Sequence, residues 1–130
     1  MNVLLSIHPE HAEKIYKGIK IIEWRKVTPK LTGGEKIFLY ETAPVMKVTG
    51  FFTVGKYSYV LDNEELEKPN SKIIEFGQVS KEFLKRYKGK SPALYGLIVT
   101  SYTKFDTSKA LADFGIKRAP QNYQYTDKDF

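Results

Sequence analysis

The first part of the chain changes from an alternating pattern of apolar residues to a helical spacing. Apolar side chains occupy the odd positions of residues 3–8, which predicts a strand with Ser6 and His8 pointing away from its core face. The proline that follows His8 suits the first turn of a helix, and Gly18 suits the left-handed residue that ends one. We therefore expect the strand to be followed by a helix over residues 9–17.

Most of the remaining apolar segments favour strands, because they are rich in the aromatic and β-branched residues that suit a pleated, half-buried surface. Glycine and proline residues separate these segments and mark turns. We expect strands over residues 19–27, 36–41, 46–59 and 93–105. The third of these contains Gly50 and Gly55, which indicates a bend or a bulge of the kind that closes small barrels.

Few helices are expected after the first. Ser80 is suited to cap a helix that ends at Gly89, with apolar residues on one side and basic residues on the other. Thr107 or Ser108 is suited to cap a last short helix that ends at Gly115. The acidic segment of residues 62–67 is expected to be a loop or a helical turn, and the tail of residues 118–125 is expected to be irregular.

The length of 130 residues and the hydrophobic content of 42% are sufficient for one core, so we expect a single domain over residues 1–130 of the α+β class, mainly β. The apolar runs are far shorter than the roughly 20 residues that cross a bilayer, and the first residues lack the basic segment of a signal peptide. A soluble, cytoplasmic protein with no membrane partner is the resulting expectation. The chain has no cysteine and only 2 histidines, so we expect no disulfide, no metal and no cofactor.

The formal charge of +6 favours a polyanionic partner, because Lys and Arg side chains release counterions when they bind a phosphate backbone. Solubility alone would explain an excess of this size equally well. Residues 81–90 hold five basic residues and one acid, whereas residues 62–67 hold four acids and no base. This separation predicts a directional electric field at the surface, with Lys85, Arg86 and Lys88 as a basic patch.

The second expected strand carries charged residues that share a face. Alternation places Ile22 and Trp24 on the core face. Glu23 and Arg25 lie on the other face, about 6.6 Å apart along the strand. Lys20 has the wrong parity to join them on a regular strand, so the three charges converge only if Lys20 lies in the preceding turn or at a bulge. An exposed strand face, with ion pairs worth about 0–1 kcal/mol, is the ordinary interpretation of this spacing.

These charges occur in a recognisable order of features. A strand that ends near Ser6, a helix started by a proline and the pattern G-x-K-x-x-E-x-R at residues 18–25 follow one another between Leu5 and Lys26. This order resembles the opening of the ASCH domain family, and weaker similarity continues at residues 37–40, 44–45, 50–52, 95–98 and 119–121. The resemblance implies a PUA-like small β-barrel of about five to six strands with two to four short peripheral helices. It also implies a cleft near the first helix and the motif strand.

The resemblance implies nucleic-acid binding, above all RNA binding, and a role as a regulator of transcription or of RNA metabolism. In this interpretation Lys20, Arg25 and Lys26 contact phosphates or a base edge. Glu23 orients Arg25 or accepts a hydrogen bond from an exocyclic amine, and a tyrosine offers a stacking face. The residues expected to bind RNA or a nucleotide-like anionic ligand are Ser6, His8, Lys20, Glu23, Arg25, Lys26, Tyr40, Gln121 and Tyr123, with Lys85, Arg86 and Lys88 as an accessory basic patch.

Each of these residues also has an ordinary structural explanation. Tyrosines in a small barrel more often belong to the core than stack on bases, and Trp24 is assigned to the core. A basic helix face is more often solvated than engaged. His8 directly precedes the first expected helix, so it caps that helix or orients a loop unless a partner makes it an acid or a base.

Hydrolysis is the alternative function that the resemblance leaves open. Some proteins similar to ASCH domains hydrolyse the amide of N4-acetylcytidine with a Lys-x-x-Thr arrangement and a downstream glutamate. Here Glu23 stands where that threonine does, so the hydroxyl nucleophile is missing, and catalysis by Lys20 and Glu23 would require a lowered lysine pKa. Other members resemble metal-assisted ribonucleases, for which Glu23 alone makes a weak metal site.

A nucleotide sensor is the third interpretation. The same cleft would hold a free nucleoside or nucleotide and report its presence to a partner. Because Glu23 replaces the threonine, we favour binding over catalysis.

Overall fold

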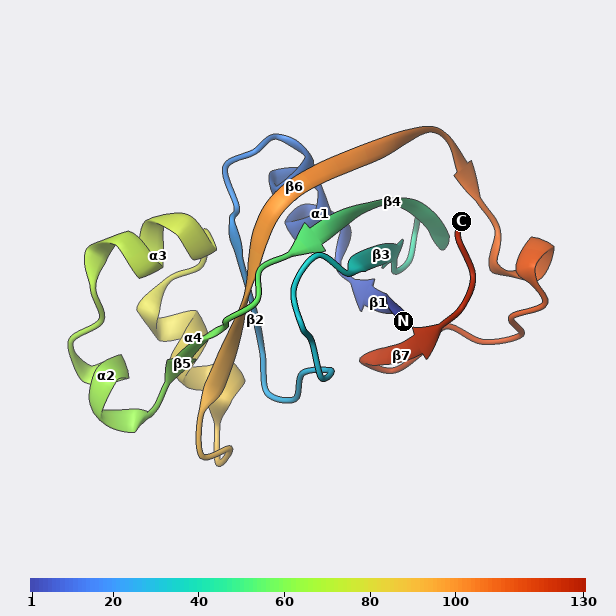
Figure 1. Ribbon diagram of the computed structural model, residues 1–130. Helices are drawn as coiled ribbons and strands as arrows, with labels where there is room; N and C mark the ends of the chain where they lie inside the picture. Colours follow the sequence, from blue (N-terminus) through green and yellow to red (C-terminus); the bar gives the residue numbers. More distant parts are fainter.

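One strongly curled β-sheet of seven strands forms the frame of the molecule, seen in a computed structural model that describes residues 1–130 (Figure 1). The strands are β1 (Asn2–Ile7), β2 (Ile22–Arg25), β3 (Lys36–Glu41), β4 (Lys47–Val54), β5 (Tyr59–Leu61), β6 (Leu94–Lys109) and β7 (Tyr123–Thr126). They are ordered β2-β6-β4-β3-β1-β7, and β5 pairs with β6. β1 and β3 run parallel, and the other pairs are antiparallel. The mainly β architecture expected from the sequence is confirmed.

Short helices lie outside the sheet. They are α1 (Pro9–Tyr16), α2 (Asn63–Glu67), α3 (Ser71–Gly77) and α4 (Lys81–Lys88), together with the 3-10 turn η1 (Leu111–Phe114). α1 lies against the middle of the sheet, whereas α2, α3 and α4 form a group beside β2 and β5 (Figure 1). No helix of the structure is long and apolar enough to cross a membrane.

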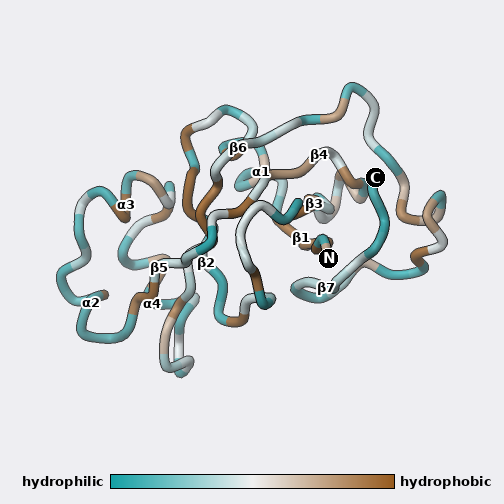
Figure 2. Tube along the Cα trace, in the orientation of Figure 1, coloured by the Kyte–Doolittle hydropathy of each residue, from teal (hydrophilic) through white to brown (hydrophobic).

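Three clusters of buried apolar side chains hold the sheet and the helices together. Both faces of β1 are covered, because Leu5 packs in the cluster that contains α1 and Leu4 packs in a second cluster with Phe130. The third cluster joins Trp24 of β2 to Leu84 of α4. Figure 2 shows the apolar character of β1, β3 and β4 and the largely polar upper arc of β6. Each fully buried Leu or Phe of this kind contributes about 1.5–3 kcal/mol to stability.

Two helix boundaries agree with the sequence. α1 begins at the proline after His8, and Gly18 follows it with a φ of +75°. α4 is preceded by Ser80, whose hydroxyl accepts a hydrogen bond from the Phe83 N–H at 3.0 Å, and it ends at Gly89. These signals lie within one helical turn of the boundary, so the sequence is sufficient to place them.

The motif strand begins later than its pattern indicates. The sequence predicts a strand over residues 19–27, but β2 starts only at its fourth position. The N–H groups of Lys20 and of the residue before it bond to the Lys14 carbonyl, each at 3.1 Å. The N–H of Ile21 bonds to the Phe76 carbonyl at 2.8 Å. These groups cannot join the ladder with β6, so this part of the prediction is wrong and Lys20 lies in a turn.

The long aromatic segment of residues 46–59 is bent, as its glycines indicate. Most of it forms β4, which ends before Gly55. Of the remaining predicted residues, only the last one belongs to a strand, where β5 begins. The ladder between β4 and β6 is irregular between Val48 and Gly50. A side chain at Gly50 would collide with the Thr103 carbonyl oxygen, so the close approach of the two strands requires glycine there.

Several predictions for the later part of the chain are wrong. β6 extends to Lys109, so Thr107 and Ser108 are strand residues and cap no helix. The turn η1 follows Ala110, which makes no side-chain cap, although it ends as expected at Gly115. The tail contributes β7, and α3 forms where no helix is predicted. β7 exists because it pairs with β1 from the opposite end of the chain, which no local pattern reveals.

Candidate ligand-binding cleft

A cleft of about 440 Å³ opens between α1, the motif strand β2 and α4. Its floor is polar and holds Lys20, Glu23 and Arg25. One wall is aromatic and consists of Phe83 and Tyr87. This volume lies at the small end of the range of about 300–1,000 Å³ that is typical of small-molecule sites.

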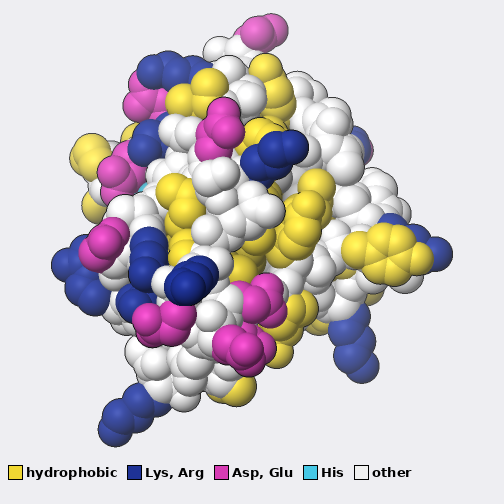
Figure 3. Space-filling view, turned by 90° about the vertical axis from the view of Figure 1, so that its left-hand side faces the viewer, with side chains coloured by type: hydrophobic (Ala, Val, Ile, Leu, Met, Phe, Trp, Pro, Cys, Tyr) yellow, Lys and Arg dark blue, Asp and Glu magenta, His cyan; other side chains and the backbone are white.

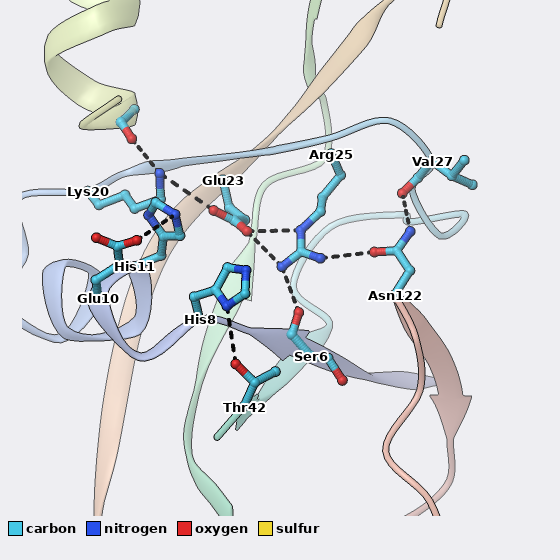
Figure 4. Close-up of polar contacts among 11 residues, drawn as sticks. Ser6, His8, Glu10, His11, Lys20, Glu23, Arg25, Val27, Thr42 and Asn122 are labelled. Atoms are coloured by element: carbon cyan, nitrogen blue, oxygen red, sulfur yellow. Dashed lines mark hydrogen bonds and ion pairs between the residues drawn. The ribbon is translucent and has the colours of Figure 1, made fainter. Parts of the chain in front are cut away.

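Arg25 is fixed at the floor by contacts with three segments of the chain (Figure 4). Its Nε donates to Glu23 Oε2 at 2.9 Å, and its Nη2 lies 2.8 Å from the same oxygen. Nη2 also donates to the Ser6 carbonyl at 2.8 Å, and Nη1 donates to Asn122 Oδ1 at 3.0 Å. Most donors of the guanidinium are therefore occupied by the protein itself.

Lys20 approaches the same carboxylate from the turn before β2. Its side chain is 1% exposed, and its Nζ lies 3.5 Å from Glu23 Oε1. The Nζ also donates to the carbonyl of Gly77 at the end of α3 (Figure 4). Lys20 thus converges with Glu23 and Arg25 because it lies in the turn, which is the condition that strand parity imposes.

The buried charges of the floor compensate one another. Burial alone raises the pKa of the Glu23 carboxyl, but the charges of Arg25 and Lys20 outweigh burial and hold this pKa below its usual range. Burial lowers the pKa of the Lys20 amine, and the charge of Glu23 opposes that shift. The floor is therefore one anion enclosed by two cations, and each charge requires the others to remain buried.

His8 lies at the mouth of the cleft. Its Nδ1 is 3.2 Å from the hydroxyl oxygen of Thr42, in the turn after β3. Although it directly precedes α1, its side chain makes no capping bond to that helix. Of the two structural roles expected for His8, the geometry agrees with orienting a loop and not with capping.

His11 lies beside His8 and deeper in the cleft. Its side chain is 13% exposed and packs edge-on against Phe83, with ring centroids 6.1 Å apart. Its Nδ1 is buried and has no hydrogen-bond partner within the protein. Buried polar atoms are normally paired, so this nitrogen is an exception within the protein.

The protonation of His11 gives a pH-dependent prediction. Burial lowers the pKa of His11 below 6.5, so the imidazole is neutral at pH 7. The unfolded chain therefore binds this proton more readily, and the free energy of unfolding is expected to fall as the pH is lowered through 6.5 toward the folded pKa. Denaturation at several pH values should show a flatter dependence in this window for His11→Gln. An NMR titration that places the His11 pKa at or above 6.5 would contradict the prediction.

The aromatic wall is provided by α4. Phe83 and Tyr87 lie one turn apart, with ring centroids 6.0 Å apart and an angle of 15° between the rings. The ammonium of Lys26 lies 5.1 Å from the centre of the Tyr87 ring, at the rim of the cleft. An apolar wall above a polar floor suits a flat ring with polar edges.

The structure brings together most of the residues that the sequence nominates. Those that line the cleft are Ser6, His8, Lys20, Glu23, Arg25 and Gln121. Lys26 reaches the rim through Tyr87. Tyr40 is 8% exposed in the second core cluster, and Tyr123 packs on the first cluster with its hydroxyl 3.3 Å from the Thr28 carbonyl. Neither of these two tyrosines lines the cleft.

Sequence reasoning missed several residues that line the cleft, namely His11, Thr42, Phe83 and Tyr87, and also Asn122, which holds Arg25. The spacing of three residues between His8 and His11 could have indicated that both face the same side of the first helical turn. Asn122 has no comparable signal, because it meets Arg25 across 97 positions of the chain.

The polar groups considered as nucleophiles in the cleft are already engaged in hydrogen bonds or ion pairs within the protein. The Ser6 hydroxyl donates to the Pro120 carbonyl, and the Thr42 hydroxyl is paired with His8. The Lys20 amine is engaged by Glu23 and by a backbone carbonyl. No group of three or more His, Asp or Glu side chains is arranged to hold a metal ion. This arrangement suits recognition of a ligand.

Opposite charges that are separated along the chain meet in space. Lys85 Nζ lies 3.1 Å from Glu67 Oε1, and Lys81 Nζ donates to the Glu67 carbonyl at 2.6 Å. The face that carries α2, α3 and α4 shows basic and acidic side chains interspersed around apolar ones (Figure 3). The expected separation of sign is therefore absent, because α2 packs against α4.

Lys88, expected in the basic patch, has a structural role. It is 2% exposed, and its Nζ donates to Asn63 Oδ1 at 2.6 Å and to the Ser91 carbonyl. Lys88→Met should lower the free energy of unfolding by about 1–2 kcal/mol, because both acceptors lose their donor. Lys85→Met, which removes only an exposed ion pair on the same helix, should change it little in the same urea titration. Equal losses in the two variants would show that Lys88 has no special structural role.

Comparison with known proteins agrees with this fold. The model of the ASCH domain family matches residues 5–106 of the chain. The crystal structure of ASCH from Zymomonas mobilis superimposes with a TM-score of 0.83 at 20% sequence identity, over 98% of this chain and 88% of that one. A single-site variant of the same protein gives a TM-score of 0.82 at 19% identity, over 98% and 91% of the two chains.

A similar sequence also occurs within a longer protein. A protein of Ureaplasma parvum serovar 3 named ATP synthase subunit alpha is 29% identical over 123 residues, which is 95% of this chain. The chain spans only 15% of the length of that protein. The name therefore describes a protein of which the matching segment is a small part.

Proposed function

The chain belongs to the ASCH domain family of PUA-like nucleic-acid-binding domains, and from this premise we propose that it binds RNA by holding one unpaired base in its cleft. The observation that carries the proposal is the cleft itself, about 440 Å³ in volume, with an aromatic wall and a floor of fixed polar groups. A site of this size suits one base and not a stacked run of bases. Sequence-specific proteins read RNA mainly through unpaired bases that are removed from the stack.

Base-edge contacts would come from groups that remain available in the cleft. The His11 imidazole and the Gln121 amide both lie in the lining. These atoms can donate to or accept from the edge of a base, while Phe83 and Tyr87 pack against its faces. Arg25 then contributes mainly by holding the floor in place, and less by contacting phosphate as the sequence suggests.

Phosphate contacts would come from exposed cations close to Tyr87, over its ring or next to it in the sequence. Lys26 and Arg86 are exposed and are not held in ion pairs. Such side chains gain affinity for a strand by releasing its counterions, so the affinity should decrease with salt. A cytoplasmic location and a regulatory role in transcription or RNA metabolism form part of the proposal.

Equilibrium binding tests the proposal directly. The anisotropy of a labelled single-stranded RNA of roughly ten nucleotides should rise on titration with the protein, and salt should weaken the binding. The same sequence in a perfect duplex should bind more weakly, because its bases are stacked and paired. Equal affinity for duplex and single strand would exclude a site for an unpaired base.

A nucleoside monophosphate as competitor separates RNA binding from the sensor alternative. If the monophosphate displaces the labelled RNA only at high concentration, the result agrees with one base held within a longer strand. Tight binding of the monophosphate without binding of RNA would favour a sensor instead.

Hydrolysis is favoured by one observation, the lowered pKa of the buried Lys20 amine. Against this, the amine is held by Glu23 and by the Gly77 carbonyl, and the hydroxyls of Ser6 and Thr42 are engaged within the protein. Product formation from N4-acetylcytidine or from RNA would replace binding by catalysis as the function.

A further inference from the structure

A second cavity borders a different face of α1 from the ligand cleft. Its volume is about 430 Å³, and it shares no lining residue with that cleft. The residues that α1 contributes follow one another at spacings of three and four positions, which places them on one face of the helix. The cavity is completed by the end of β3 and by β6, and its lining residues are Pro9, Glu13, Tyr16, Lys17, Glu41 and Lys104.

Glu41 is buried in this cavity without a partner. It is the last residue of β3 and is 8% exposed, yet its carboxylate takes part in no ion pair and no side-chain hydrogen bond. Glu23, which is 5% exposed, is by contrast enclosed by two cations. Charged side chains are rarely buried unless they are paired, because burial removes their hydration. An unpaired carboxylate that lines a cavity therefore points to a cation as its ligand.

Tyr16 forms a fixed and uncharged wall of the cavity. Its hydroxyl lies 2.9 Å from the hydroxyl oxygen of Thr49. Burial raises the pKa of the Tyr16 hydroxyl, and although the hydrogen bond to Thr49 opposes this shift, the charge of Glu41 adds to it. Tyr16 therefore stays protonated, and it provides no counterion for Glu41.

Lys104 supplies an unpaired positive charge at the same cavity. Its ammonium lies over the Tyr16 ring, 5.8 Å from the centre, and it takes part in no ion pair. The other two charges of the lining already satisfy each other, because Lys17 Nζ lies 2.9 Å from Glu13 Oε1. The cavity thus offers one unpaired anion, Glu41, and one unpaired cation, Lys104.

The balance of these charges selects the kind of ligand. Two carboxylates and two ammonium groups line the cavity, so a ligand with a single charge would leave the site with a net charge. A ligand that carries both an ammonium and a carboxylate keeps the balance, and it gives each unpaired group a partner of opposite sign. An α-amino acid carries these two groups on neighbouring atoms at neutral pH.

We propose that this cavity binds a small α-amino acid, whose ammonium pairs with the Glu41 carboxylate and whose carboxylate pairs with the Lys104 ammonium. The ring of Tyr16 lies between the two charged groups as the wall of the site. Because the two sites have no lining residue in common, binding of an amino acid here does not depend on binding of RNA in the cleft.

Three probes of similar size test whether both charges are recognised. Alanine carries both groups, ethylamine carries only the ammonium, and propionate carries only the carboxylate. Because the recognised groups belong to every α-amino acid, alanine is a sufficient probe. In an NMR titration of the whole chain up to about 100 mM, since ligands of few atoms bind weakly, alanine should shift resonances around Tyr16 in a saturable way. The other two probes should bind about tenfold more weakly or worse, because each lacks one charged contact.

Two substitutions remove the charges of the site separately. Glu41→Gln and Lys104→Met should each weaken alanine binding by about tenfold or more. Lys109→Met is the matched control, since Lys109 also lies on β6 with its ammonium 4.4 Å from the centre of an aromatic ring, that of Phe105, but does not line the cavity. Glu41→Gln should leave the urea midpoint unchanged or raise it, because an unpaired charge costs more to bury than an amide.

Saturable binding of alanine that both substitutions weaken and the control leaves intact would support the proposal. Circular dichroism verifies that each variant is folded. The absence of a saturable shift with alanine at the highest concentration would overturn the proposal. Ethylamine that binds as tightly as alanine would also overturn it, because the cavity would then take a simple cation. So would alanine binding that Lys109→Met weakens as much as Lys104→Met does.

Discussion

Glu23→Ala is expected to lower the free energy of unfolding by about 3–5 kcal/mol, because it leaves two buried cations without their anion. Lys20 is 1% exposed and Arg25 is 12% exposed, so water cannot replace the lost carboxylate. Urea denaturation followed by circular dichroism measures the change. The exposed pair of Glu13 and Lys17, with an N–O distance of 2.9 Å, provides the control. Glu13→Ala should leave the urea midpoint almost unchanged.

A second substitution distinguishes loss of charge balance from loss of packing. Lys20→Met combined with Glu23→Ala removes one of the two stranded cations, so part of the lost stability should return. If the losses from the two substitutions simply add, the floor of the cleft is not a coupled charge network. An unchanged urea midpoint for Glu23→Ala alone would likewise show that the floor is not a coupled charge network.

Tyr87→Ala is expected to weaken binding of single-stranded RNA by roughly 5- to 150-fold, which corresponds to about 1–3 kcal/mol for one base packed on an aromatic side chain. Tyr87 is half-buried at the cleft and is therefore part of the proposed wall for the base. Fluorescence anisotropy at fixed salt measures the change. The substitution should weaken binding of duplex RNA less, since a paired base does not enter the cleft.

Tyr57→Ala is the matched control for this experiment. Tyr57 is 76% exposed and does not line the cleft, so its removal should leave RNA affinity unchanged. Equal effects of the two substitutions would place the RNA elsewhere on the surface. Tyr87 is a sharper test than Lys20 or Arg25, because those two cations hold the floor together and their loss would disturb the fold itself.

The early part of the fold follows from local pattern. The alternation before His8, the proline after it and Gly18 define β1 and α1, since each signal acts within a few residues. The cap at Ser80 places α4 for the same reason. The end of β6 was not predictable in this way, because Thr107 and Ser108 suit either a cap or a strand and pairing with β4 decides between them.

The candidate site was predictable in part. Strand parity assigns Ile22 and Trp24 to the core, and both are buried in the third cluster. Parity also groups Glu23 with Arg25, which the structure joins by an ion pair. The position of Lys20 depended on where β2 begins. Hydrogen bonds from its turn to α1 and α3 set that point, and no pattern within the motif encodes them.

By itself, the sequence determined the mainly β class, the first strand and helix, and the charged motif, because periodicity, capping and strand parity operate over a few residues. Only the tertiary structure decided how the charges of the motif are arranged. It buried Lys20, Glu23 and Arg25 as an ion-paired floor, placed Phe83 and Tyr87 above it, and paired Lys85 with Glu67 so that the expected charge separation disappeared. The physical reason is that burial and charge compensation depend on segments that meet only after the chain has folded, and the energy of a charge depends on its neighbours in space.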